Sequence, residues 1–260
     1  MPSIRFGFNL LFTVVLAAAA LLAAAPGTRA GTPAGTENLV LILDASGSMW
    51  GQIGGRAKID IAKEVLEEVV TDLPDGLNTG LVAYGHRRKG DCEDVEQLVP
   101  VGPLDRAKLI RTIQALQPKG KTPMLHSVRR TAETIRDLEG HTVVLLVSDG
   151  KETCAQDPCG GVRTLKQEGA KFTLYVIGFD VTDEEKAQLA CMAESGGGRY
   201  FAAKNAEEFK VAAAQAISAS REVGVIEVSP LKQGKLFRAL VTVKRADDGR
   251  PVTASYSTEQ

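Results

Sequence analysis

The chain has 260 residues, of which 44% are hydrophobic and 24% charged, an ordinary balance for a protein that buries a core. This length suits one good-sized domain and a little more, or two small domains. The formal net charge of −1 gives no reason to expect nucleic acid or an anionic membrane surface as the partner, because both favour a basic chain.

The N-terminal segment has the composition of a secretory signal peptide. Arg5 gives it a positive start, residues 8–25 are almost unbroken apolar sequence, and Thr28-Arg29-Ala30 matches a cleavage site. The apolar run is also close to the length that spans a bilayer, so a retained membrane anchor is the alternative. We expect residues 1–30 to be removed and residues 31–37 to be a linker. The mature protein would then be periplasmic or secreted, without a membrane span.

Strands alternate with helices from residue 38 onward. Residues 39–43 are a continuous apolar run, typical of a strand buried on both faces, and residues 57–70 have apolar side chains at helical spacing. The other elements that we predict are strands at 79–84, 95–99, 142–147, 172–177 and 199–202, and helices at 105–116, 125–138, 161–168, 182–192 and 205–219.

This alternation predicts an α/β domain over residues 38–220, with a doubly wound, mostly parallel central sheet and helices on both faces. The short loop before the strand at 95–99 favours one antiparallel edge strand. From residue 222 to residue 260 the pattern changes to strands joined by turns, at 225–228, 236–243 and 251–256. So few residues cannot bury a core unaided, and we expect the start of a second, β-rich domain.

Three loops carry oxygen-bearing side chains. The strand at 39–43 runs into Asp44-Ala45-Ser46-Gly47-Ser48, the strand at 142–147 runs into Ser148-Asp149-Gly150, and Thr122 precedes the helix at 125–138. In a doubly wound sheet the first and fourth strands are central neighbours, so Asp44 and Asp149 should lie side by side beyond the carboxyl ends of the strands. Carboxylates and hydroxyls suit Mg²⁺, Mn²⁺ or Ca²⁺ and disfavour zinc and copper.

At these loops the sequence resembles the von Willebrand factor type A domains, over about residues 38–219. The pattern Asp44-x-Ser46-x-Ser48, with Thr122 and Asp149, stands where that family has its metal-ion-dependent adhesion site. The resemblance implies that the hydroxyls of Ser46, Ser48 and Thr122 bind the metal directly. It also implies that Asp44 and Asp149 act largely through bound water, and that an acidic side chain of a protein ligand completes the coordination shell. Residues 84–92 and 149–154 look like those of exported bacterial members.

Our hypothesis is therefore a divalent-cation-dependent binding protein of adhesion type, in the cell envelope or secreted, and not an enzyme. Its partner would be a protein that offers an acidic side chain, and its oligomeric state is not predicted. One alternative is a structural component of an envelope assembly with a vestigial metal site. Another is a metal-dependent hydrolase, such as a phosphatase with Asp44 as nucleophile. An aspartyl phosphatase would need a second acid nearby, where Ser46 and Ser48 stand instead.

Simpler explanations compete at several of these positions. Serine favours turns and helix N-caps, which alone would explain Ser46 and Ser48. His86 is followed by three basic residues, so we expect a solvated loop rather than a general base. Trp50 either contacts a ligand at the rim of the site or simply covers the loop.

Four cysteines, at positions 92, 154, 159 and 191, indicate disulfides in an exported chain and allow three pairings. A local bridge between Cys154 and Cys159 would stiffen the rim of the site. The remaining pair, Cys92 and Cys191, fits the predicted topology poorly, so the connectivity stays open. Structural zinc is disfavoured, because Cys154 and Cys159 have no second pair of matching spacing.

Overall fold

The computed structural model describes residues 38–222 continuously, and beyond them residues 231–232, 235–236, 243–244 and 251–252. The predicted signal peptide and linker lie outside the described residues. Within the described part of the chain, no helix is both long enough and apolar enough to cross a membrane.

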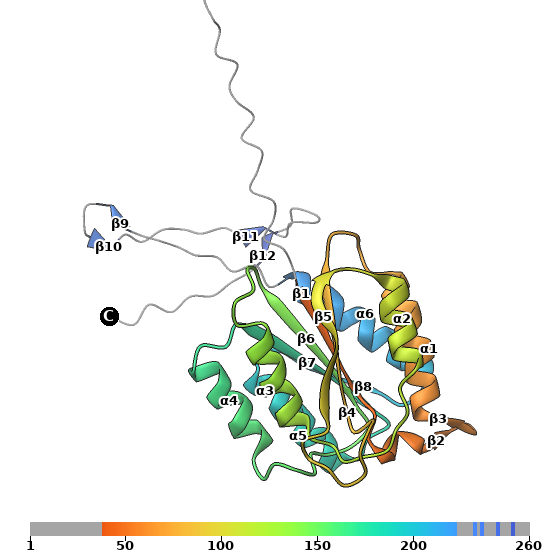
Figure 1. The fold of residues 1–260 in the computed structure, drawn as a ribbon. Helices are drawn as coiled ribbons and strands as arrows, with labels where there is room; N and C mark the ends of the chain where they lie inside the picture. The colour runs from red at the N-terminus through yellow and green to blue at the C-terminus, as the bar shows by residue number, and fades with distance from the viewer. Residues whose placement is uncertain (1–37, 223–230, 233–234, 237–242, 245–250, 253–260) are drawn as a thin grey trace, which may run out of the picture. The chain divides into compact units, whose positions relative to one another are not determined.

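A six-stranded sheet forms the centre of the domain, in the order β5-β4-β1-β6-β7-β8 (Figure 1). Its strands are β1 (Asn38–Asp44), β4 (Asn78–Tyr84), β5 (Val95–Pro103), β6 (Thr142–Ser148), β7 (Phe172–Phe179) and β8 (Tyr200–Ala203). All neighbouring pairs are parallel except β5, which joins β4 antiparallel at the edge. The antiparallel edge strand and the central pairing of β1 with β6 are confirmed.

Helices cover both faces of the sheet (Figure 1). One face carries α1 (Lys58–Thr71), α2 (Arg106–Gln114) and α6 (Ala206–Glu222), and the other carries α3 (Met124–Thr134), α4 (Pro158–Gln167) and α5 (Asp183–Ser195). Because side chains alternate along a strand, Leu41 and Leu43 of β1 join the core under α1, whereas Val40 and Ile42 join the core under α3. The doubly wound α/β fold is therefore confirmed.

The structure differs from the prediction mainly in short elements and in the ends of long ones. The helix predicted at 125–138 ends at Thr134, and β5 continues to Pro103. A 3-10 helix at Gly47–Trp50 and a hairpin of β2 (Gln52–Ile53) with β3 (Arg56–Ala57) precede α1. Strands of two residues show no alternation of apolar and polar side chains, so the sequence could not reveal this hairpin.

The C-terminal segment contains two antiparallel strand pairs. β9 (Leu231–Lys232) pairs with β10 (Lys235–Leu236), and β11 (Val243–Lys244) pairs with β12 (Pro251–Val252). The other residues of the predicted C-terminal strands lie outside the described part, so a second β-rich domain stays a prediction.

Glycines let three loops approach one another at the carboxyl edge of the sheet. Gly85 follows β4 with a φ of +68°, and a Cβ atom there would lie 2.5 Å from the carbonyl oxygen of Lys121 and 3.0 Å from the Cα atom of Ser46. The amide of Gly120 donates to the carbonyl of Gly85 at 2.7 Å, and the amide of Gly47 donates to the carbonyl of Gly120 at 3.0 Å. Backbone hydrogen bonds thus join the loops after β1, after β4 and before α3.

Replacing Gly85 by alanine should cost more stability than replacing Gly76. Gly76 also has a positive φ (+83°), but a Cβ atom there would meet no other atom within 4 Å. We expect Gly76→Ala to lower the free energy of unfolding by about 1–2 kcal/mol through backbone strain alone. Gly85→Ala should lose roughly 1–3 kcal/mol more through overpacking. Urea denaturation followed by circular dichroism measures both, and equal losses would contradict the close approach of the loops.

Candidate metal centre

Asp44 ends β1 and is fully buried. Its Oδ1 accepts a hydrogen bond from the amide of Ser46 at 2.8 Å, and its Oδ2 accepts from the hydroxyls of Tyr84 at 2.8 Å and Ser148 at 2.7 Å. Tyr84 and Ser148 end the two strands that flank β1, and Tyr84 lies directly opposite Asp44 in the parallel register. Burial raises the pKa of Asp44, and these hydrogen bonds oppose the rise because they favour the charged form.

A chain of hydroxyls connects the loop after β1 to the loop after β6. The Oγ atoms of Ser46 and Ser48 lie 2.9 Å apart, and the Ser48 hydroxyl donates to Oδ1 of Asp149 at 2.6 Å. Asp149 directly follows β6 and is buried. The structure thus places Asp44 and Asp149 on adjacent strand ends, with both serines at the same edge.

One oxygen of this cluster lacks a hydrogen-bond donor. Oδ2 of Asp149 is buried and accepts no hydrogen bond from the described residues, while the ammonium group of Lys58 lies 3.4 Å from it. Burial and the nearby charge of Asp44 raise the pKa of Asp149 to about 6, and the Ser48 hydroxyl and the Lys58 charge oppose this rise. The ion pair with Lys58 compensates part of the charge on this oxygen, and a bound cation would give it a direct ligand as well.

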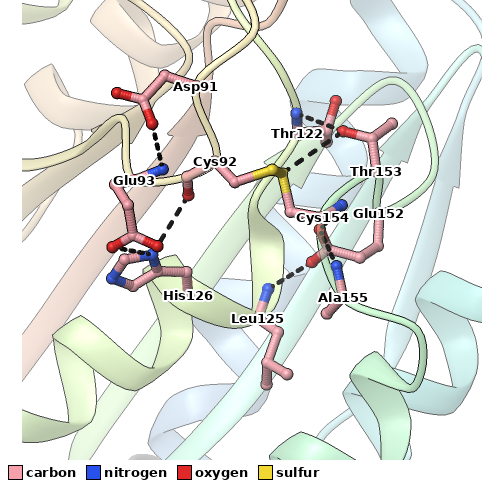
Figure 2. Close-up of a disulfide and its surroundings, with 10 residues drawn as sticks. All are labelled: Asp91, Cys92, Glu93, Thr122, Leu125, His126, Glu152, Thr153, Cys154 and Ala155. Atoms are coloured by element: carbon pink, nitrogen blue, oxygen red, sulfur yellow. Dashed lines mark hydrogen bonds and ion pairs between the residues drawn. A yellow bond between two sulfur atoms is a disulfide. The ribbon is translucent and has the colours of Figure 1, made fainter.

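Thr122 reaches the same edge through backbone contacts. It lies two residues after Gly120, which pairs with Ser46 in an isolated parallel bridge. Its amide donates to Oγ1 of Thr153 at 2.9 Å, and the amide of Thr153 donates to its carbonyl at 3.2 Å (Figure 2). The Thr122 side chain is buried but makes no hydrogen bond to the other four predicted ligands. Four predicted ligands are therefore joined directly, and the fifth is held beside them by a neighbouring loop.

The residues at this edge fit a hard divalent cation. Two carboxylates and up to three hydroxyls supply oxygen atoms only, and such donor sets suit Mg²⁺, Mn²⁺ or Ca²⁺. In the described part of the chain, no group of three His, Cys, Asp or Glu side chains is placed to hold a metal ion. Hydroxyl oxygens would therefore have to share in binding a cation between Asp44 and Asp149.

A disulfide between Cys92 and Cys154 joins the loop after β4 to the loop after β6, with the two Cα atoms 5.6 Å apart (Figure 2). Cys154 directly follows Thr153, whose amide and hydroxyl both bind the backbone of Thr122. The disulfide therefore braces the loop that positions Thr122.

Glu152 connects this braced loop to the start of α3 (Figure 2). Its buried carboxylate accepts hydrogen bonds from the amide of Leu125 at 2.7 Å and from the amide of Cys154 at 2.8 Å. Burial raises the pKa of Glu152, and these backbone hydrogen bonds oppose the rise. A carboxylate at the N-terminus of a helix also satisfies amides that lack partners within the helix.

The second disulfide, Cys159–Cys191, joins α4 to α5. The local bridge between Cys154 and Cys159 that the sequence suggested is therefore wrong. Cys159 lies in the first turn of α4 and Cys191 in the third turn of α5, and their Cα atoms are 5.7 Å apart. Cys154 and Cys159 are close in sequence, but each one faces a different neighbouring element.

The loop that follows His86 is exposed over residues 87–90, as expected, but the His86 side chain itself packs inward. That side chain is only 10% exposed, and its Nε2 lies 3.0 Å from Oε2 of Glu96. The buried carboxylate of Asp94 accepts hydrogen bonds from the amides of Arg87 and Arg88 at 2.8 Å, which folds the loop tightly. The arginine side chains reach solvent while the histidine packs inward.

Three residues that contact the site were not recognised in the sequence: Tyr84, Ser148 and Lys58. Tyr84 and Ser148 stand at strand ends, so only the order and register of the sheet could have indicated them. Lys58 begins α1, and nothing in its sequence surroundings connects it to Asp149.

Tyr84→Phe should destabilise the protein because it removes a donor from a buried carboxylate. Burial and the Asp44 charge raise the pKa of Tyr84, so its hydroxyl stays protonated and donates. In the presence of chelator, we expect the free energy of unfolding to fall by about 1.5–3 kcal/mol. Tyr200→Phe is the matched control, because the Tyr200 hydroxyl is buried without a hydrogen-bond partner among the described residues. Urea denaturation that gives the same loss for both variants would refute this role of Tyr84.

Removing the Cys92–Cys154 disulfide should loosen the Thr122 loop without unfolding the domain. In Cys92→Ser/Cys154→Ser, we expect amide hydrogen exchange at residues 119–125 to accelerate roughly tenfold or more, because local opening no longer has to deform the bridged loop. Cys159→Ser/Cys191→Ser is the control, and its exchange should change around α4 and α5 instead. Mass spectrometry of exchanged, digested protein measures both, and identical exchange maps would rule out the proposed bracing.

Comparison with known proteins bears on the fold and the family of this domain. The family model for the von Willebrand factor type A domain matches residues 38–215. The uncharacterized protein YwmD of Bacillus subtilis (strain 168) is 30% identical over 184 residues, which cover 67% of this chain and 82% of YwmD.

Two solved structures share the fold. The pilus adhesin SpaC from Lactobacillus rhamnosus GG has 14% identity and a TM-score of 0.58, over 72% of this chain and 31% of SpaC. Proximal thread matrix protein 1 from the mussel byssus, with a zinc-occupied MIDAS motif, has 17% identity and a TM-score of 0.57, over 72% of this chain and 46% of that protein. The chain thus spans less than half the length of either structure. Because the family model matches well over half of the chain, this protein belongs to the von Willebrand factor type A domain family.

Proposed function

We propose that this protein is a binding module of adhesion type, in which a divalent cation bridges to an acidic group on a protein partner. The proposed ligands are Asp44, Ser46, Ser48, Thr122 and Asp149. The buried Oδ2 atom of Asp149 carries the proposal, because its one polar neighbour among the described residues is the Lys58 ammonium at 3.4 Å, while the Ser48 hydroxyl holds the other oxygen of the same carboxylate. Mg²⁺ is the cation that we propose, with Mn²⁺ or Ca²⁺ as alternatives, since all the donors are hard oxygens.

The neutral and the charged side chains of the site would have different roles in cation binding. The hydroxyls of Ser46, Ser48 and Thr122 would hold the cation directly, and the two aspartates would supply negative charge. Asp44 is fixed by hydrogen bonds to both of its oxygens, so it would act without moving. Hydroxyls are neutral ligands, so the protein alone would hold the ion modestly. A bound cation would then offer a positive charge to a partner's carboxylate.

Two structural relatives support this kind of function. SpaC is a pilus adhesin, and the MIDAS motif of the mussel byssus protein holds zinc. We therefore extend adhesion-type binding to this chain as a proposal and include Zn²⁺ among the ions to test. Zn²⁺ remains a weaker candidate here, because the site offers no imidazole or thiolate.

The rim of the site offers a contact surface for the partner. Trp50 is 49% exposed, yet its indole Nε1 donates to the carbonyl of Pro118 at 2.9 Å, which fixes the ring in place. The exposed side chains of Lys119 and Lys121 follow Pro118 in the same loop. A fixed aromatic ring bound to a loop that carries two exposed lysines suits an acidic partner surface, because aromatic anchors and opposite charge both favour binding.

We propose that the protein acts in the periplasm or outside the cell. Its two disulfides persist best in oxidising compartments, which supports the predicted export. We also propose a role in binding and not in catalysis. The groups that contact the Asp44 carboxylate are an amide and two hydroxyls, where an aspartyl phosphatase would use a second acid. A structural role with a vestigial site is the remaining alternative, and cation binding distinguishes it.

Cation binding should depend on the serine hydroxyls. Because Ser48 is exposed and Ser48→Ala removes only one oxygen, we expect the fold to survive and the affinity for Mg²⁺ or Mn²⁺ to fall roughly tenfold or more. Ser218→Ala, at an exposed serine of α6, is the matched control and should bind like wild type. Isothermal titration calorimetry measures each affinity.

Partner capture from the exporting cell extends this test. A partner held in Mg²⁺ should be released by chelator and should not be retained by Asp44→Ala, whose fold circular dichroism checks. Capture that persists under both conditions would exclude a cation bridge.

A further inference from the structure

Lys58 is a largely buried cation that the proposed metal ligands do not include. It is the first residue of α1, where the helix dipole disfavours a positive charge, and its side chain is only 11% exposed. Its Nζ lies 3.4 Å from Oδ2 of Asp149 and 3.1 Å from Oδ2 of Asp180, and it donates to the carbonyl of Asp180 at 3.1 Å. The two aspartates compensate for a charge that the helix alone would not favour.

Asp180 directly follows β7 and has an unusual backbone conformation, in which it contacts Lys58. Apart from glycines, it alone among the described residues has a positive φ, at 53°. Its amide donates to the carbonyl of Ala203 at 2.7 Å, which fixes the turn. In this conformation both its carbonyl oxygen and its carboxylate contact the Lys58 ammonium. A residue held in a sparsely populated conformation indicates that its surroundings impose a specific contact.

The Lys58 ammonium group and a divalent cation would both be attracted to the carboxylate of Asp149. Oδ2 of Asp149 is the buried oxygen that lacks a hydrogen-bond donor, and the Lys58 charge lies next to it. Two positive charges beside one carboxylate repel each other, most strongly where little water screens them. Asp180, whose side chain is 45% exposed, lies outside the proposed ligand set and gives the ammonium a second partner.

We propose that Lys58 lowers the affinity of the site for divalent cations, and that Asp180 limits this effect by holding the ammonium group away from a bound cation. The inference rests on the proposed function and adds a residue that sets the affinity of the site for its cation. A site weakened in this way holds its cation firmly only when a partner carboxylate adds negative charge. Cation and partner would then promote each other's binding, as linkage requires.

The test compares Mn²⁺ binding by calorimetry in the full chain and its variants. Lys58→Met removes the charge and keeps the length of the side chain, and we expect it to bind Mn²⁺ about tenfold more tightly than wild type. Lys58→Arg keeps the charge and should bind like wild type. A merely structural role would give the opposite sign, because a loosened site binds its metal less well.

The contribution of Asp180 is measured in a double-mutant cycle. Asn tolerates a positive φ, so Asp180→Asn removes the charge with little added strain. We expect Asp180→Asn to weaken Mn²⁺ binding about threefold when Lys58 is present, and by clearly less in the Lys58→Met background. An equal effect in both backgrounds would remove Asp180 from the proposal.

A second measurement checks the same proposal without metal. In chelator, Lys58→Met should have a lower melting temperature than wild type, because Asp149 loses its counter-charge. Lower stability without metal, together with tighter Mn²⁺ binding, is the expected pair of results. Unchanged or weaker Mn²⁺ binding in Lys58→Met, with clear binding in wild type, would overturn the role of Lys58 and leave the metal site standing. No Mn²⁺ binding in either protein would overturn the proposed function as well.

Discussion

The buried carboxylate of Asp44 is the constraint on which the carboxyl edge of this sheet depends. A charge removed from water must be compensated, and here an amide and two hydroxyls do so. One hydroxyl comes from the end of β4 and the other from the end of β6. All three strands must therefore end at the same level, so a single register secures the core and places Asp44, Ser46 and Asp149 together.

The elements with periodic patterns could be predicted from the sequence, and so could the meeting of Asp44 with Asp149. Strands buried on both faces show as apolar runs, and the strand order of a doubly wound sheet then brings the two loops together. The role of Tyr84 could not be predicted, because it depends on the register of β4 against β1, which no local pattern encodes. The contacts of Lys58 could not be predicted for a related reason, since its partners follow β6 and β7 and lie far from it in sequence.

The incorrect Cys154–Cys159 bridge and the unexpected burial of the His86 side chain have one cause: both positions were interpreted from their neighbours in sequence and not from their neighbours in space. Cys154 and Cys159 are five positions apart, yet each pairs with a cysteine of another element. His86 precedes three basic residues, yet the buried Asp94 folds their loop so that the histidine packs inward. Cysteine pairing and side-chain burial depend on how the elements pack, whereas the positions of Asp44 and Asp149 were predictable because each residue ends or directly follows a strand.

The loops after β1, after β4 and before α3 are held together by backbone hydrogen bonds among Gly47, Gly85 and Gly120. Substitutions of exposed side chains in these loops leave those hydrogen bonds in place. These contacts hold three loops together without using a side chain. The exposed side chains of the same loops, such as those of Lys89 and Lys121, take no part in these backbone contacts. Related chains can therefore vary the exposed side chains of these loops while keeping the backbone contacts that bring Asp44, Ser46 and Asp149 to one edge of the sheet.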